Sequence, residues 1–555
     1  MGFSETRQGS EPRGLDDDSR KLVLETVRQL RKKLLTKDNI LEWDRNEIFP
    51  EDAIRKMLDP EIGLQLLFIP EEYGGIGGGA RDCCAVTREM AKICLGVATA
   101  FFAIQLGSDP LLVAGTEEQK KKWLGTIADG KALVAYAVTE PDAGSNLAAL
   151  STTAEPVANE NGDIIGYKIN GNKQFISTGG YADFITLLAK APEGPTFFIV
   201  EKDTEGFVRG KAEEKHGIRA SNTSALSFSD AFVPVENLIG GIPGKGLKQA
   251  NEVFGYTRLM VASMALGAGE AALAIAIPYA KQRIQFGSPL CEKQGYTHKL
   301  IVPNVVRLEA ADAYIEEGAL RYDTGATDIE VEGSIAKYFA TEAANKTAED
   351  CIQALGGYGY ITEYEVEKIK RDVRITCIYE GTSEIQQNII STFRWKKTRK
   401  TKGQYYRSIQ DEMERLHETF KDLGCKFYAC ASNALNETIN LVHENRLTRK
   451  QYVMFLLADM ITHVEIGACL AHKAAKAAES GDGKAERLKA ISRIFANEVS
   501  QVVAQNILKI IMGSGVFNQG FVLEFMEKIS YRELIGSYEN LITDMDLVAD
   551  SVFKR

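Results

Sequence analysis

One carboxylate late in the chain stands where it could act as a base. Residues 378–386 read IYEGTSEIQ, in which Glu380 lies between an aromatic residue and a glycine, just ahead of an expected helix. Thr382 or Ser383 is the expected N-cap, and Ser383 and Gln386 have the spacing of a capping box. The helix N-terminus would favour the ionised carboxylate, whereas apolar closure would favour its neutral form. Such a balance suits a general base that takes a weakly acidic proton near neutral pH.

Two earlier stretches carry hydroxyls and an aromatic ring that could contact a flat cofactor. In AYAVTEPDAGSN, an expected strand runs into a turn that offers backbone N–H groups and the hydroxyls of Thr139 and Ser145. In QFISTGG, Phe175 and Ser177 are two residues apart on an expected strand and so should point to one face. Taken alone, the first stretch also fits an ordinary strand turn, and Phe175 also fits a core position.

A third feature suits a phosphate. Arg283 and Phe286 lie in KQRIQFGSPL, at the end of an expected long helix. A guanidinium fork matches the geometry of a phosphate group. Arg283 alone fits a surface ion pair equally well, so its assignment depends on the later stretch QALGG, which contains Gln353, Gly356 and Gly357.

Together with TRLMVASMALGAGEAALAIAIPYAKQRIQFGSPL and QALGGYGYITEYEVEKIKRDVRITCIYEGTSEIQ, these stretches resemble the acyl-CoA dehydrogenase family across roughly residues 20–393. The resemblance implies FAD as the cofactor and no metal. It places an acyl-CoA substrate near Ser145, Arg258 and Gly381. The positions that it places at FAD are Tyr136, Val138, Thr139, Ser145, Phe175, Ser177, Arg283, Phe286, Gln294, Gln353, Gly356, Gly357, Thr382 and Glu384.

The resemblance also implies a reaction. Glu380 would remove the α-proton while flavin N5 accepts hydride from the β-carbon, which gives a trans-2-enoyl-CoA. The backbone N–H of the glutamate and a ribityl hydroxyl of FAD would stabilise the enolate oxygen. Some relatives carry the base on the helix with the TR stretch, but here that site reads Tyr256, Thr257, Arg258. Reduced FAD would pass electrons to an electron-transfer flavoprotein, and Arg283 would reach the FAD of a neighbouring subunit in a homodimer or homotetramer.

Several positions depart from the family pattern. Many relatives have tryptophan and threonine where this chain has Phe175 and Ser177. Asn146 and Asn222 replace aspartates, which removes charge but keeps hydrogen-bonding size. The segment VATAFFAIQLGSDPLLV, expected beside the acyl group, has two phenylalanines and no arginine for a terminal carboxylate. We therefore expect no glutaryl-type substrate, while acyl length stays open.

The elements that must position these residues follow from changes in hydrophobic period. The apolar spacing predicts a helical domain over residues 1–135, a small β domain over 136–244, and a helical domain over 245–393, with a break or kink at Pro278. The resemblance implies an α+β multidomain fold: a helical domain, a β-barrel-like domain and a four-helix bundle. A further helical domain, 394–555, resembles the extension of very-long-chain members.

A basic run opens this last segment. Six of the nine residues from Arg394 to Lys402 are basic. The run fits a solvated helix end followed by a linker, and the alternative is a site for an acidic partner or an anionic lipid surface. Part of the extension is amphipathic, so membrane-surface association is a less favoured alternative to packing against protein.

Composition and charge exclude several function classes. The chain has 555 residues, 45% hydrophobic and 26% charged, which is enough for three or four packed units. The net charge of -10 and pI of about 5.5 argue against nucleic acid as a partner. Nine cysteines without a C-x-x-C pair or nearby paired histidines make a disulfide scaffold or zinc site unlikely. The acidic start lacks an apolar run, so we expect a cytoplasmic protein, and the absence of 18 uninterrupted apolar residues predicts no membrane span.

Two other functions stay open at this point. An acyl-CoA oxidase of the same superfamily would share the base and the extra helices but would reoxidise its flavin with oxygen. A non-catalytic or DNA-associated flavoprotein on the same fold would not need Glu380 and would show a concentrated basic face.

Overall fold

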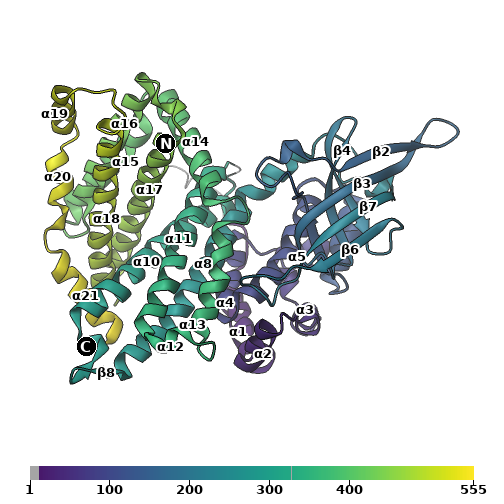
Figure 1. The fold of residues 1–555 in the computed structure, drawn as a ribbon, viewed down its shortest axis with the longest axis horizontal. Helices are drawn as coiled ribbons and strands as arrows, with labels where there is room; N and C mark the ends of the chain where they lie inside the picture. Colours follow the sequence, from purple (N-terminus) through teal and green to yellow (C-terminus); the bar gives the residue numbers. More distant parts are fainter. Residues whose placement is uncertain (1–11, 327) are drawn as a thin grey trace. The chain divides into compact units, whose positions relative to one another are not determined.

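The computed structural model describes residues 12–326 and 328–555, so the first eleven residues of the predicted N-terminal domain lie outside the described residues. The chain forms two compact units (Figure 1). We call Pro12–Ala271 with Glu367–Gly381 the amino unit, and Ala272–Val366 with Thr382–Arg555 the carboxy unit.

The amino unit begins with the predicted helices. Asp16 caps the first of them by accepting the N–H groups of Asp18 and Ser19. The helices are α1 (Asp17–Lys33), α2 (Lys37–Arg45), α3 (Glu51–Leu58), α4 (Ala80–Ile93), α5 (Leu95–Ala114), α6 (Glu117–Gln119), α7 (Gly125–Ala128) and most of α13 (Glu365–Val373). Short 3-10 or π turns lie at Leu64–Phe68, Glu71–Tyr73, Lys120–Leu124, Leu147–Ala149, Val235–Asn237 and Arg374–Cys377.

A seven-stranded mixed sheet follows in the same unit. The strands are β1 (Val134–Ala137), β2 (Thr153–Ala158), β3 (Ile164–Ser177), β4 (Phe184–Ala191), β5 (Gly194–Glu201), β6 (Phe207–Ala212) and β7 (Thr223–Pro234). Their order is β1-β4-β2-β3-β7-β6, and β5 pairs with β4. β1 runs parallel to β4, with Ala135 opposite Ile185, whereas β3 pairs antiparallel with β2 and β7.

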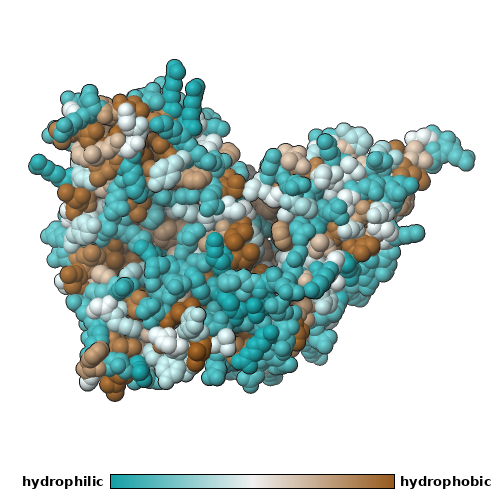
Figure 2. Space-filling model, in the orientation of Figure 1, coloured by the Kyte–Doolittle hydropathy of each residue, from teal (hydrophilic) through white to brown (hydrophobic). Residues whose placement is uncertain are grey.

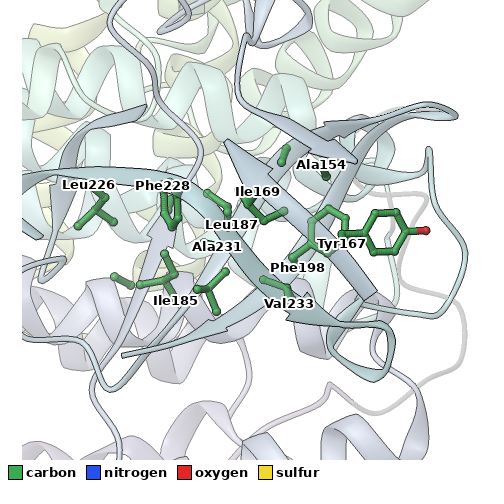
Figure 3. Packing of buried hydrophobic residues seen from close by; sticks show 14 of the residues in the cluster. Ala154, Tyr167, Ile169, Ile185, Leu187, Phe198, Leu226, Phe228, Ala231 and Val233 are labelled. Carbon is green, nitrogen blue, oxygen red and sulfur yellow. The ribbon is translucent and has the colours of Figure 1, made fainter. Parts of the chain in front are cut away.

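The core of this sheet is formed by alternating apolar residues. Ile169 of β3, Leu187 of β4 and Phe198 of β5 are fully buried, and Figure 3 shows their side chains lying together. The rings of Tyr167 and Phe198 have centroids 5.0 Å apart. This packing fixes the register of β3, whose far end carries Phe175 and Ser177.

The carboxy unit is helical apart from one hairpin, β8 (Ile284–Gln285) and β9 (Ser288–Pro289). Figure 1 shows α15 to α18 side by side in this unit. Its helices are α9 (Gln294–Tyr296), α10 (Val302–Asp323), α11 (Glu330–Leu355), α12 (Gly357–Tyr360), α14 (Ser383–Lys400), α15 (Gln404–Thr419), α16 (Cys425–Glu444), α17 (Gln451–Glu479), α18 (Ala485–Ile511), α19 (Gln519–Lys528), α20 (Tyr531–Ile535) and α21 (Leu541–Phe553). Short turns lie at Leu290–Glu292, Thr297–Ile301, Leu447–Arg449 and Gly536–Tyr538.

The helix break expected at Pro278 is wrong. Helix α8 runs from Gly246 to Gln282 with Pro278 inside it. Pro278 lies one turn before the end of the helix, where the proline ring removes one backbone hydrogen bond but only a short segment must continue. The long helix therefore delivers Arg283 directly to the hairpin that follows.

The basic run is a mostly solvated helix end followed by a short turn, as predicted, but its first residue is buried. Helix α14 continues to Lys400, and Arg394 inside it is only 3% exposed. Its guanidinium binds Glu465 through Nε at 2.7 Å and Nη2 at 2.9 Å, and binds Glu332 at 2.8 Å. Of the other basic residues of the run, Arg399 lies 3.9 Å from Glu444 of α16, and the Lys397 ammonium lies 4.2 Å from the centre of the Tyr405 ring. Only the charge of Arg394 is balanced by buried acids.

Three helices, α5, α8 and α17, are long and apolar enough to cross a membrane by length and composition. Uninterrupted apolar runs did not reveal these helices, and the expectation that the chain does not span a membrane stays a prediction. The apolar windows of these helices are 78%, 72% and 83% buried inside the structure. Packing within the protein gives this composition a structural reason.

The carboxy unit also exposes apolar side chains near its end. Figure 2 shows brown residues along the side where Figure 1 places α19 to α21. In the sequence after residue 510, Met512, Leu523 and Ile542 are each more than half exposed. The predicted membrane-surface alternative stays a prediction.

Candidate active site

Glu380 is held in an unusual backbone conformation. Its φ is 55°, in the left-handed region, and Gly381 follows with φ 88°. A residue with a side chain adopts this region at a cost of about 1–3 kcal/mol, and such strain gathers at functional sites. Thr257 of α8 donates its hydroxyl to Glu380 Oε2 at 3.1 Å. The amino unit therefore fixes both the direction and a hydrogen bond of the predicted base.

The predicted capping box is wrong, although one of the two expected N-caps is correct. Thr382 is the N-cap of α14, and its hydroxyl accepts the N–H of Ile385 at 3.4 Å. Ser383 instead donates its hydroxyl to Glu342 at 2.6 Å. A partner 41 residues earlier in the chain thus outweighs the local capping pattern.

A second carboxyl group that the sequence analysis missed is electrostatically coupled to Glu380. Asp109 of α5 is 0% exposed, and Tyr256 of α8 donates its hydroxyl to Oδ1. Burial raises the pKa of Asp109 to about 8, the Tyr256 hydrogen bond opposes that rise, and the charge of Glu380 adds to it. The signal in the sequence was a lone acid in the otherwise apolar segment of residues 95–114.

Tyr136 of β1 joins the same group. Burial raises the pKa of its phenol well above the usual value, and the charges of Glu380 and Asp109 raise it further. The phenol oxygen is buried and makes no hydrogen bond within the described part of the chain. Its ring lies edge-on to Phe254 of α8, with centroids 6.0 Å apart. The predicted cofactor residue Tyr136 is therefore brought close to the predicted base.

A buried ion pair shapes the turn after β1. Lys173 of β3 is 0% exposed and donates to Glu140 Oε1 at 2.7 Å and to the carbonyl of Val138 at 3.1 Å. Glu140 also accepts from the backbone and hydroxyl of Ser151 and from the N–H of Thr152. Sequence reasoning missed both partners, although Glu140 lies within the stretch TEPDAGS.

The same contacts bring two predicted cofactor segments together. The N–H of Gln174 donates to the carbonyl of Thr139 at 2.9 Å, so the turn after β1 lies against the end of β3. Phe175 follows immediately and is 64% exposed. Ser145 lies further along the turn and is exposed.

The argument that placed Phe175 and Ser177 on one face fails at this point. Phe175 has φ 59°, and the pairing of β3 with β7 shifts register between Lys173 and Ile176. A bulge of this kind interrupts the alternation of a regular strand. The side chain of Asn222 helps to hold the turn that follows, because its Oδ1 accepts the N–H of Gly180 at 2.9 Å.

Arg258 and the two phenylalanines of the expected acyl segment are buried. Arg258 is 7% exposed, and its guanidinium carbon lies 6.0 Å from the centre of the Phe254 ring. Phe101 and Phe102 are 1% and 3% exposed, and Phe101 packs edge-on against Phe68. Whether they border an acyl group stays open.

The carboxy unit carries the remaining predicted cofactor residues. Arg283 and Phe286 lie on or beside the β8–β9 hairpin, and Phe286 is 98% exposed at its tip, with φ 50°. A fully exposed phenylalanine in a strained turn buries nothing within its own chain. This geometry is typical of a residue that contacts another molecule.

The QALGG stretch ends α11 in a glycine-specific turn. Gly356 has φ 59° and ψ -137°, and a side chain at Gly356 or Gly357 would meet no atom within 4 Å. Gln353 and both glycines are exposed. Gln294 lies elsewhere in this unit and donates its amide to Asp546 of α21 at 3.0 Å. Glu384, in the first turn of α14, is exposed.

Comparison with known proteins identifies this fold. Three family models match: "Acyl-CoA dehydrogenase, N-terminal domain" over residues 17–131, "Acyl-CoA dehydrogenase, middle domain" over 135–231, and "Acyl-CoA dehydrogenase, C-terminal domain" over 244–393 and 413–536. The chain belongs to the acyl-CoA dehydrogenase family. The predicted family, its fold and its oxidoreductase class are confirmed.

Individual relatives define how far the likeness extends. An acyl-CoA dehydrogenase of Bacillus subtilis (strain 168) is 41% identical over 369 residues, which cover 65% of this chain and 94% of the relative. The Caffeyl-CoA reductase-Etf complex subunit CarC of Acetobacterium woodii is 36% identical over 68% of this chain and 99% of its own.

A solved structure extends the likeness to the end of the chain. The acyl-CoA dehydrogenase complexed with FAD from Bacillus anthracis has a TM-score of 0.85 and 26% identity, and the match covers 97% of this chain and 95% of that one. That match includes most of the extra helices, which the Bacillus subtilis relative cannot cover at its length.

Proposed function

We propose that the protein is an FAD-dependent acyl-CoA dehydrogenase that converts an acyl-CoA thioester to the 2-enoyl-CoA, with Glu380 as the base. One observation carries the proposal: Glu380 is held in the left-handed region with its carboxylate bonded to Thr257. A strained, hydrogen-bonded carboxylate is expected to persist where its direction matters for the reaction. When bound, FAD supplies the hydride acceptor.

Residues of both units fit FAD. The exposed ring of Phe175 lies beside the turn of Thr139, and the buried phenol oxygen of Tyr136 has hydrogen-bonding capacity left over in the described structure. In the carboxy unit, Arg283 and Phe286 are exposed and offer a cation and an aromatic ring to a second molecule. The cofactor named for the Bacillus anthracis structure is FAD.

Within this proposal the chain performs the proton transfer. Glu380 takes the α-proton of the thioester, and the hydrogen bond from Thr257 to Oε2 helps to hold the carboxylate in place. The backbone N–H of Glu380 is the proposed donor to the enolate oxygen. Arg258, buried on the same helix as Thr257, is proposed to order the substrate region.

The proposed electron acceptor is an electron-transfer flavoprotein, and the proposed assembly is a homodimer or homotetramer. The Acetobacterium woodii relative is named as a subunit of a complex with Etf. Its name also describes a reductase. The exposed Phe286 supports a subunit contact at the hairpin. The cytoplasmic location stays a proposal.

Replacing Glu380 tests the function. Glu380→Gln keeps the size and a hydrogen-bond acceptor for Thr257 but removes the basic oxygen, so the variant should bind FAD and lose at least about 1,000-fold in the rate of flavin bleaching. The measurement is anaerobic flavin absorbance during titration with straight-chain, branched, cyclic and aromatic acyl-CoAs. Oxygen uptake by the reduced enzyme without an acceptor protein would instead favour an oxidase.

Glu363→Gln is the matched control, because Glu363 is an exposed carboxylate of the segment that precedes α13. It should bleach like the wild type. Substantial bleaching in Glu380→Gln would assign the base elsewhere, and a protein that cannot be reconstituted with FAD would refute the proposed function.

A further inference from the structure

Asp109 is buried, and it has fewer hydrogen-bond donors and cations beside it than an ionised carboxylate needs in the protein interior. It lies inside α5, between Ser108 and Pro110, and all three residues are buried. Tyr256 donates to Oδ1, whereas Oδ2 is buried and has no hydrogen-bond partner in the described residues. No ion pair joins Asp109 to a lysine or arginine of residues 12–326 or 328–555. An isolated buried carboxylate of this kind is strongly disfavoured relative to the neutral acid.

The titratable groups that face Asp109 add no positive charge. They come from three elements: Tyr256 from α8, Tyr136 from β1, and Glu380 from the segment before α14. Two of the three are phenols, and the third is a carboxylate of the same sign as an ionised Asp109 would have. None of the three supplies a positive charge to an ionised Asp109. Only the Tyr256 hydroxyl stabilises the anion, by donating a hydrogen bond.

A second buried carboxyl in the same unit shows what an ionised group requires. Glu140 also has little solvent exposure, 3% against 0% for Asp109, but it contacts the ammonium of Lys173 and three further donors. These donors lower the pKa of Glu140 to about 2 despite burial, whereas the pKa of Asp109 rises to about 8. The contrast depends on the number of donors and on the presence of a cation, since burial is common to both.

We propose that Asp109 is a positioning residue of the Glu380 centre that works as a neutral acid, and that its ionisation sets the alkaline limit of the reaction. While Asp109 is neutral, Glu380 carries the single negative charge of the carboxyl pair, and the developing enolate meets no second anion. Through Tyr256, Asp109 also fixes the turn of α8 that presents Thr257 to Glu380. This inference rests on the proposed function.

The pH profile of kcat/KM tests the proposal, because it reports groups of the free enzyme. In the wild type, kcat/KM should fall above about pH 8 and should lose about tenfold per pH unit once Asp109 is ionised. Asp109→Asn has nearly the same shape, accepts from Tyr256 and cannot ionise, so its profile should stay level over that range. Asp52→Asn, which changes an exposed carboxylate of α3, should keep the wild-type profile.

Tyr256→Phe provides a second variant, which should move the alkaline fall instead of removing it. It removes the one hydrogen bond that stabilises the Asp109 anion, so the alkaline fall should move to higher pH. A merely structural role for Asp109 predicts no such displacement. Tyr256→Phe also decides the matter if Asp109→Asn does not fold.

Infrared spectroscopy reads the protonation state without turnover. The FAD-loaded wild type at pH 7 should show a carboxylic acid C=O band that Asp109→Asn lacks and that disappears as the pH rises through about 8. Absence of that band, or an alkaline fall that Asp109→Asn retains, overturns the proposal on Asp109. Failure of every acyl-CoA to bleach the wild-type flavin is a different result, because it overturns the proposed function itself.

Discussion

Replacing Lys173 by methionine should loosen the turn after β1 more than any exposed substitution on the same sheet. The lysine ammonium joins Glu140 to the carbonyl of Val138, and all three groups are buried. Methionine fills a similar volume but donates no hydrogen bond. Glu140 would keep its bonds from Ser151 and Thr152 but would lose its counter-ion.

The magnitude follows from the two pKa values. Burial lowers the pKa of Lys173 to about 8 even though Glu140 raises it, whereas the Glu140 pKa is lowered to about 2 because hydrogen bonds, first of all from Lys173, outweigh burial. The lowered pKa of Lys173 means that its charge destabilises the folded state, and the lowered pKa of Glu140 means that its charge stabilises it. These two contributions to the free energy of unfolding offset each other, so the intact pair changes stability little. Removing one partner leaves the other charge buried, at a cost of about 3–5 kcal/mol.

Hydrogen exchange measures this cost where it arises. Because the affected bonds join the turn after β1 to β3, peptides that cover residues 134–180 should lose about two to three orders of magnitude of protection in Lys173→Met. Lys168→Met is the matched control, since Lys168 lies on the same strand and is exposed. It should change stability by less than about 0.5 kcal/mol. The double variant with Glu140→Gln should be less destabilised than the sum of the single variants.

A loss in Lys173→Met no larger than that in Lys168→Met would refute the argument. It would mean that water or a rearranged donor replaces the ammonium beside Glu140. FAD retention gives an independent reading, because the same turn carries Val138 and Thr139, so the variant should also release FAD more readily.

Two further predictions concern buried charge. The folded pKa of Glu140, about 2, lies below its ordinary 4.5, so the stability that its charge contributes is complete above pH 4.5, and about 3 kcal/mol of it is lost as the pH falls to 2. Glu140→Gln should lack this part of the acid unfolding curve. Identical curves for the variant and the wild type would contradict the assignment. Arg394→Met should cost about 3–5 kcal/mol, seen as a lower thermal midpoint. Glu465 would stay buried without its cation, and Glu332 would keep only Arg321, at 3.8 Å. Arg399→Met on the exposed side of α14 is the control, and equal midpoints would show that the buried ion pairs add nothing.

The sequence predicts what depends on local pattern. Hydrophobic period locates the helical and β segments, and Thr382 is a correct N-cap candidate because its hydroxyl lies directly before the helix and accepts the N–H three residues on, that of Ile385. Contacts between distant residues are not accessible in this way. Ser383 binds Glu342, 41 residues away, and Arg394 binds Glu465, 71 residues away, so the predicted capping box is wrong and the burial of Arg394 was not predicted.

Backbone irregularity is the second reason why the sequence alone does not predict the site. The alternation rule assumes a regular strand, but β3 is bulged at Phe175, and no single residue type in QFISTGG announces the positive φ. At Glu380, by contrast, the neighbouring residues already indicated an irregular backbone. Its φ of 55° was not predicted, yet its neighbour Gly381 and the helix start at Ser383 already confined it to a tight turn.

The chemical state of a carboxyl group is the hardest property to read from sequence, and here it decides the proposed site. Glu140 follows an apolar segment and Asp109 lies within one, and hydrophobic pattern does not predict that one would be charged and the other neutral. The structure separates them by their donors: an ammonium and three other groups for Glu140, and one phenol for Asp109. Because charge follows donors, the first acts as a fixed anion that orders a turn. In the proposed mechanism the second is neutral at pH 7, which leaves Glu380 to carry the negative charge that proton removal requires.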